Sequence, residues 1–302
     1  MDGGLCLLPY NPAEFSEANL MATMTMFATA GTVSDAPAAA MTGAMMEYVF
    51  FNCPECQEQI KAQNHVYLGS ASIPPYDLLC RRDTQITSLE DFAGKRIRSG
   101  GSNFTRIAEY FGATSVTMKG AEVFDGLDKG VLDCIMIAVS ELVTLRLVEV
   151  TDQVMLGWPG GVYVGQNYPG MNRESWQTLN AEQRAFALRS AAEMTADGVI
   201  NFDTGNQAGL AAGREKGMTV TEADDAIRAK TVEFLKGDLE AIRAEFSDQY
   251  GLENVDEKLT TAQALIEKWK SLTNGELSQE KLAQIYWDEL YSKLDAATYG
   301  MD

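Results

Sequence analysis

Histidine is almost absent from this sequence: His65 is the only one in 302 residues. Its scarcity excludes metal sites built from several histidines, and a Ser-His-Asp triad could use only this residue. Glycine-rich GxxxxGK[ST] and GxGxxG loops and the GxSxG turn are missing too. The sequence therefore offers no basis for nucleotide-dependent or familiar hydrolytic chemistry, and we expect no cofactor, no metal and no catalytic residues.

Basic residues and long apolar runs are also scarce. Lys and Arg number 24 against 43 Asp and Glu, a net charge of −19, which repels nucleic acid and anionic membranes. No apolar run approaches the ~20 residues of a membrane-spanning helix. The first residues, MDGG, lack the basic region and the apolar region of a signal peptide, so we expect export to depend on a segment outside this sequence.

The apolar content of 46% is enough for one large domain or two lobes. Strand and helix patterns alternate between residues 95 and 139, which predicts a parallel α/β sheet. From Asn180, where Gln183 completes a capping box, apolar residues recur with a helical period almost to the end of the chain. In the first part we predict strands at 5–8, 66–69 and 76–79 and helices at 14–30, 36–51 and 54–64.

Three of the five cysteines and the histidine could form a group: Cys53, Cys56, His65 and Cys80. We favour a structural role, a local disulfide or buried thiols, and expect at least one cysteine to stay unpaired. A zinc site or a thioredoxin-like redox pair is the alternative, although the C-x2-C-x8-H-x14-C spacing matches no common zinc motif.

Residues 86–139 carry a recognisable pattern. It consists of ITSLEDFAGKRIR at 86–98, Gly112-Ala113, Met118, Glu122-Val123-Phe124 and Gly130-Val131-Leu132-Asp133. This resembles the solute-binding proteins of TRAP (tripartite ATP-independent periplasmic) transporters, in which a "sleDlkGlkiR" stretch leads to "Evy.aL..GvvDg". The residue types and spacings agree over about fifty positions with one deletion, and weaker similarity extends towards the C-terminus.

The resemblance implies an α/β, two-lobed clamp with mixed sheets and a long helical C-terminal part. It divides the chain into residues 1–75 plus 165–202 for lobe I and 76–164 plus 203–302 for lobe II with the C-terminal helices. It also implies a periplasmic protein that is not an enzyme, that captures a small organic acid and that passes it to the membrane subunits of a TRAP transporter. Family members have strand and helix units before the strand that we place at 5–8, so we expect lobe I to lack them.

In the family, the arginine that ends the "kiR" strand pairs with the substrate carboxylate, and here that residue is Arg98. A guanidinium offers a planar, two-pronged donor set that matches a carboxylate. We also expect Ser102 to begin a helix whose free N–H groups point to the same anion. The alternative for Arg98 is an ordinary surface arginine in an acidic protein.

Four further residues are weaker candidates for the ligand site. Tyr76 and Trp158 lie in or beside loops near the expected cleft, where aromatic residues more often pack in the core. At Ile137 and Gly120 the sequence departs from the family members that hold polyhydroxylated acids. Ile137 would present an apolar wall and Gly120 would leave space, so we expect a carboxylate with an apolar or aromatic body, unless Ile137 faces the sheet interior.

Two other functions fit the same sequence. An enzyme on a similar scaffold could use Asp133 or Glu122 as an acid or base, but no paired base or nucleophile is near them. A ligand-binding sensor module is the second alternative.

Overall fold

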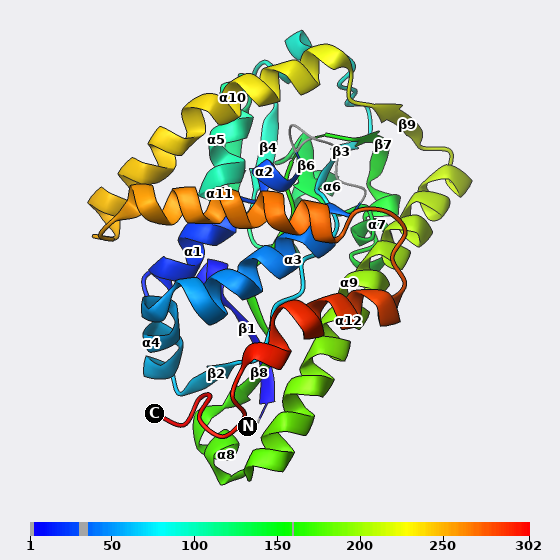
Figure 1. Ribbon diagram of the computed structural model, residues 1–302. Helices are drawn as coiled ribbons and strands as arrows, with labels where there is room; N and C mark the ends of the chain where they lie inside the picture. Colours follow the sequence, from blue (N-terminus) through cyan, green and yellow to red (C-terminus); the bar gives the residue numbers. More distant parts are fainter. Residues whose placement is uncertain (1–2, 30–35, 159) are drawn as a thin grey trace.

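The computed structural model describes residues 3–29, 36–158 and 160–302, which form two sheets surrounded by helices (Figure 1). Sheet A has the strand order β1-β8-β2, and sheet B has the order β5-β4-β6-β3-β7-β9. The strands are β1 (Gly3–Leu7), β2 (His65–Tyr67), β3 (Asp77–Arg81), β4 (Arg96–Ser99), β5 (Thr114–Thr117), β6 (Cys134–Ile137), β7 (Thr151–Leu156), β8 (Gln166–Asn172) and β9 (Thr219–Glu222).

The helices surround both sheets, and most of them follow the apolar patterns of the sequence. The predicted helix at 14–30 is interrupted near Met24, which separates α1 from α2, and residue 30 lies outside the described residues. The helices are α1 (Ser16–Thr23), α2 (Met26–Thr29), α3 (Pro37–Glu47), α4 (Pro54–Ala62), α5 (Ser102–Tyr110), α6 (Val123–Asp128), α7 (Glu141–Thr144), α8 (Arg173–Thr178), α9 (Ala181–Glu215), α10 (Asp225–Ala244), α11 (Val255–Leu272) and α12 (Gln279–Glu289), with π-helical turns η2 (Tyr48–Asn52) and η6 (Glu245–Gln249).

Sheet B contains the predicted parallel unit. β4 pairs in parallel with β5 and with β6, as the alternation of strand and helix predicts. β3 runs antiparallel to both β6 and β7 because it enters from sheet A through a direct connection rather than a crossover helix. The start of β3, the end of β7 and the carboxyl ends of β4, β5 and β6 therefore meet at one edge of the sheet.

The helix boundaries follow local capping signals. α9 begins with the predicted capping box, in which the side chains of Asn180 and Gln183 each accept a backbone N–H of the other residue. α9 runs from sheet A past sheet B, so one 35-residue helix spans both parts of the molecule (Figure 1). Among the residues described, no helix combines the length and apolarity required to span a membrane.

The sequence analysis groups α11 and α12 in residues 203–302, as the C-terminal helices that accompany lobe II. Both helices contribute to the hydrophobic core that surrounds sheet A. The reason is shape: a Cβ atom at Gly43 of α3 would lie 2.1 Å from the ring of Trp269, so α11 lies tightly on α3. The Tyr286 hydroxyl of α12 donates to the carbonyl of Ala39 at 2.9 Å. The exact division of the chain between the lobes stays a prediction.

Candidate functional site

Arg98 lies near the carboxyl end of β4, at the edge of sheet B where the connections to sheet A begin. The residue is only 3% exposed, and its Nε donates to the carbonyl of Met118 at 2.9 Å. A Cβ atom at Gly100 would lie 3.0 Å from Nη1 of Arg98, so this glycine lets the guanidinium lie against the backbone. Residues 98–100 thus form a compact, positively charged corner.

The charge of Arg98 is not balanced by a neighbour, because no carboxylate of the described residues lies within ion-pair distance of it. Arg106, one helix further along the chain, shows the contrast. Its guanidinium is paired with Asp238 of α10 and, at 2.7 Å, with Glu245 of η6. A buried cation that lacks a counter-charge from the described residues is costly, which makes Arg98 suited to bind the anion of a ligand.

The start of α5 lies beside this corner. Ser102 is the first helical residue, and Gly101 precedes it in an extended conformation. Because the first N–H groups of a helix have no intrahelical acceptor, they favour an anion at this end. Asn103 is 4% exposed, and its side-chain amide donates to Thr25 Oγ1 at 3.4 Å, which joins α5 to the segment between α1 and α2.

A cavity of about 180 Å³ lies next to this helix start, between the elements of the two sheets. Residues 100–104 form one side of the cavity, and Asn19, Ala22 and Thr23 of α1 form the other. The rest of the wall comes from the connection at 162–164 and from Pro9, Pro12, Glu245, Phe246 and Tyr250. Ser102 therefore borders a space between the lobes, whereas Arg98 is not among the residues that line it.

The aromatic candidates pack near the same edge. Tyr76 is 5% exposed and stacks on Phe104, with 4.9 Å between the ring centroids. Trp158 is 1% exposed and contacts Phe92 and Phe111, at centroid distances of 5.2 and 4.8 Å. Its indole Nε1 has no hydrogen-bond acceptor in the described part of the chain. Trp158 is thus mainly a core residue, whereas Tyr76 lies where the first connection enters β3.

The two positions that suggested an apolar ligand differ in their surroundings. A Cβ atom at Gly120 would have no neighbour within 4 Å and the residue is half-buried, so the position is open, and its place in the ligand site stays a prediction. Ile137 is buried with Leu79 and Val123 in a cluster separate from the one that holds Tyr76 and Trp158. Ile137 therefore faces the sheet interior, the alternative left open by the sequence, and its packing gives no support to an apolar wall of the ligand site.

Asp77 is a buried acidic residue at the same edge of sheet B that the sequence analysis did not single out. It is the first residue of β3, and its Oδ1 accepts the backbone N–H of Gly157 at 3.0 Å, directly after the end of β7. The carboxylate thereby ties together the two connections to sheet A. Burial raises the pKa of Asp77 to about 7, with the nearby charge of Glu222 as a further cause and the Gly157 hydrogen bond opposing both. The sequence held one signal for this residue, a single aspartate in the apolar strand predicted at 76–79.

The acid proposed for an enzymatic alternative has a structural partner. Asp133 accepts Nη2 of Arg96 at 2.6 Å and Nε at 2.9 Å. Burial alone would raise the pKa of Asp133, but the hydrogen bonds from Arg96 lower it below its ordinary value. The carboxylate therefore stays charged and paired.

Cys53, Cys56 and Cys80 all form disulfides, so the zinc alternative for them is wrong. Cys53 and Cys56 are bonded to each other, which confirms a local disulfide. Cys80 is bonded to Cys134, its partner across β3 and β6 in the antiparallel register. The second bond was not expected, because the two cysteines are 54 positions apart and only strand pairing brings them together.

Comparison with known proteins supports the same fold. The model of the family described as "Bacterial extracellular solute-binding protein, family 7" matches residues 79–245, more than half of the chain. A curated relative, a "Solute-binding protein" of Albidiferax ferrireducens, is 25% identical over 121 residues. This segment covers 36% of the present chain and 36% of that relative.

Solved structures of TRAP solute-binding proteins match over most of the chain. One from Rhodoferax ferrireducens, in complex with copurified benzoate, has a TM-score of 0.70 at 20% identity and covers 90% of this chain and 80% of its own. One from Bordetella bronchiseptica, with bound (R)- and (S)-mandelate, has a TM-score of 0.67 at 20% identity, and the match covers 89% of this chain and 81% of that structure. One from Desulfovibrio salexigens, with bound orotic acid, has a TM-score of 0.70 at 12% identity, and the match covers 89% of this chain and 81% of that structure. The two-lobed α/β fold is thereby confirmed.

Proposed function

Because the chain belongs to family 7 of the bacterial extracellular solute-binding proteins, we propose that it captures a small organic carboxylate in the periplasm for a TRAP-type transporter. The membrane subunits of that transporter are its partners in this proposal, and the chain catalyses no reaction of the captured ligand. The pairing of Asp133 with Arg96 supports the non-catalytic part, because it removes this candidate base from use.

The observation that carries the proposal is Arg98. Its guanidinium is buried at the edge of sheet B without a carboxylate from the described residues, beside the start of α5. A ligand carboxylate would supply the missing counter-charge and accept two parallel N–H donors. The first turn of α5 adds a favourable dipole to the same side.

We propose that the ligand has an aromatic or apolar body rather than a sugar-like one. Tyr76 and Phe104 form a stacked pair next to the helix start, and Gly120 leaves open space. Two structural neighbours carry benzoate and mandelate, which are acids of this kind. The ring of such an acid gains from contact with apolar surface, whereas buried hydroxyl groups need partners.

Binding by closure of two lobes is the expected mechanism. The connections near residues 75–77 and 163–165 are the proposed hinges, because the chain passes there between the sheets. Small-angle scattering measures this directly: saturating ligand should lower the radius of gyration. Identical scattering with and without a bound ligand would show a rigid pocket instead.

A ligand screen tests the proposed function. The full chain is mixed with benzoate, mandelate and branched keto acids, and with sugar acids as the comparison set. We expect the aromatic or branched acids to raise the melting temperature and calorimetry to give one site per chain. Stabilisation by sugar acids alone would contradict the ligand class, and no response to any carboxylate would contradict carboxylate capture.

A further inference from the structure

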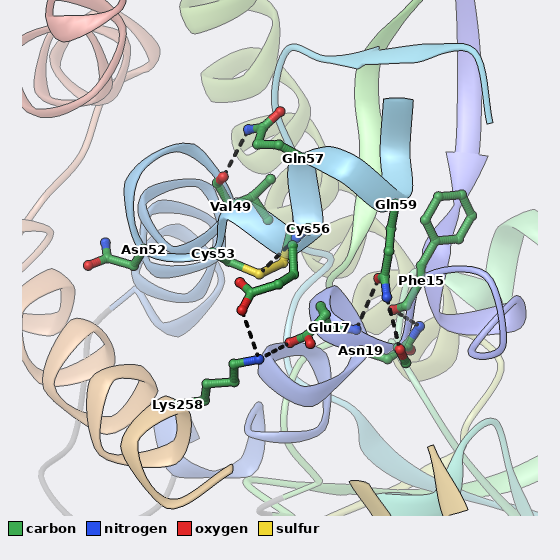
Figure 2. The surroundings of a disulfide bond; sticks show 12 residues. Phe15, Glu17, Asn19, Val49, Asn52, Cys53, Cys56, Gln57, Gln59 and Lys258 are labelled. Carbon is green, nitrogen blue, oxygen red and sulfur yellow. Dashed lines mark hydrogen bonds and ion pairs between the residues drawn. A yellow bond between two sulfur atoms is a disulfide. The ribbon is translucent and has the colours of Figure 1, made fainter. Parts of the chain in front are cut away.

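The disulfide between Cys53 and Cys56 closes the first turn of α4 (Figure 2). Cys53 caps the helix, Pro54 is its first residue, and the backbone N–H of Cys56 donates to Cys53 Sγ at 3.1 Å. A sulfur in this position is well placed to become a thiolate, because it accepts a backbone N–H at the positive end of a helix. Cys-X-X-Cys at a helix start is the arrangement that lowers thiol pKa values in redox proteins.

Three ionisable side chains surround this sulfur. Lys258 of α11 lies 2.7 Å from Glu17 Oε2 of α1 and 3.5 Å from Glu55 Oε1 of α4. A carboxylate oxygen of each glutamate lies within 4.8 Å of Cys53 Sγ. Figure 2 shows Glu17 and Lys258 directed towards the disulfide from two different helices. The bond therefore lies where the hydrophobic core around sheet A meets a cluster of charged side chains.

Glu17 is suited to exchange a proton with the neighbouring sulfur. The residue is 7% exposed, and burial raises the pKa of its carboxyl group, while the hydrogen bond and the charge of Lys258 oppose the shift and the charge of Glu55 adds to it. Tyr48 of η2 is the other titratable group that interacts with Glu17, and burial raises its pKa far above the working range. Lys258, Glu55 and Tyr48 are thus the groups whose charges act on Glu17.

The disulfide contributes little as a structural brace. It links residues only 3 positions apart, and a closed loop of this size restricts the unfolded chain far less than the loop between Cys80 and Cys134. Other contacts already hold α4 in place. Gln59 joins it to Ser16 and to the N–H of Glu17, and Gln57 donates to the carbonyl of Val49 at 2.9 Å.

The sulfur atoms lie just beneath the surface. Cys53 and Cys56 are themselves buried, but Asn52 and Pro54, on either side of Cys53, are exposed, and Phe51 is 43% exposed. A reductant therefore reaches the bond only after displacement of this turn, whose neighbouring residues are already exposed. Cys80 and Cys134, in contrast, join two central strands of sheet B.

We propose that Cys53 and Cys56 form a thiol exchange site that accepts two electrons from a dithiol, with Cys53 as the sulfur that leaves first. A donor thiolate attacks Cys56 Sγ, the S–S bond breaks, and Cys53 leaves as a thiolate held by the N–H of Cys56. Glu17 supplies a proton to this sulfur. The second donor thiolate then attacks the donor sulfur of the mixed disulfide, which releases Cys56 as a thiolate that takes a proton from water. The donor ends as a disulfide and Glu17 regains its proton from water, so two electrons and two protons have passed to the protein.

The experiment compares the two disulfides of one chain. The full-length protein is treated with dithiothreitol under native conditions, quenched with an alkylating reagent at intervals, and analysed by peptide mass spectrometry. We expect Cys53 and Cys56 to be reduced at least ~10-fold faster than Cys80 and Cys134, while the near-ultraviolet circular dichroism stays native. Reduction of both bonds at one rate, together with unfolding, would overturn the proposal.

Substitutions at two glutamates test the proton transfer. E17Q should slow the reduction of Cys53 and Cys56 several-fold and flatten its dependence on pH. E58Q is the matched control, since Glu58 is an exposed residue of α4, the helix that begins at the disulfide, and pairs with Lys61. E58Q should react at the rate of the unaltered chain. Equal rates for both variants would contradict the role of Glu17. If E17Q does not fold, the pH profile of the unaltered chain decides: a rate that rises only with ionisation of the donor thiol would count against Glu17.

Discussion

Substitution of Arg98 by methionine is the most direct test of the ligand site. Methionine preserves most of the apolar stem but removes the charge and all five N–H donors. Within the protein the substitution breaks the bond between Nε and the carbonyl of Met118. It leaves no acidic residue unpaired among the described residues, because none pairs with Arg98.

The expected effects on binding and on stability have different sizes. Loss of a desolvated, two-pronged ion pair with the ligand costs about 2 to 5 kcal/mol, which weakens binding by roughly 30-fold to several thousand-fold. Loss of the internal hydrogen bond costs the empty protein about 1 kcal/mol. Removal of the buried Arg98 charge, which has no carboxylate counter-charge among the described residues, stabilises the empty protein and offsets this cost. The free energy of unfolding of the empty protein should therefore be nearly unchanged or higher.

Calorimetry with the acid that gives the largest thermal shift measures the first effect, and urea unfolding of the empty protein measures the second. Arg96→Met is the control, because Arg96 lies on the same strand and pairs with Asp133 in the more exposed part of the protein. The control should bind within about threefold of the unaltered chain. If R98M also binds within threefold of the unaltered chain, Arg98 does not anchor the ligand carboxylate.

Three further predictions concern stability, each measured by urea unfolding. The pKa of Asp77 is about 7 in the folded protein, above its ordinary value of 3.8, so the folded state keeps a proton that the unfolded chain releases. The contribution of Asp77 to the free energy of unfolding should therefore be largest below pH 4 and fall by up to about 4 kcal/mol as the pH rises to 7. D77N should remove this part of the pH dependence, and an unchanged pH dependence in D77N would refute the raised pKa. C80A/C134A should lower the free energy of unfolding by about 4 kcal/mol, since the bond closes a loop of more than fifty residues, and an effect under 1 kcal/mol would contradict this. Gly209→Ala should cost about 1 to 3 kcal/mol, because its Cβ would lie 2.2 Å from the carbonyl oxygen of Val139, and full stability would show that α9 can move away.

Much of the local structure was determined by the sequence alone. The capping box of Asn180 and Gln183, and the left-handed glycines Gly112 and Gly130 near the ends of two helices, depend on residues a few positions apart. The pattern at 86–139 indicated the family, and the family model covers that segment. Arg98 was selected from this pattern, and its burial beside a helix start fits the selection.

The tertiary structure alone decided which distant parts of the chain meet. The bond between Cys80 and Cys134 follows from the register of two strands, and the packing of α11 on α3 depends on a glycine that accommodates Trp269. Neither fact has a local signal, because a cysteine or an apolar helix face specifies burial but not its partner. The same holds for Asp77 and Ile137, whose surroundings depend on which residue of a strand faces which side of the sheet, and a shift of one position reverses that choice.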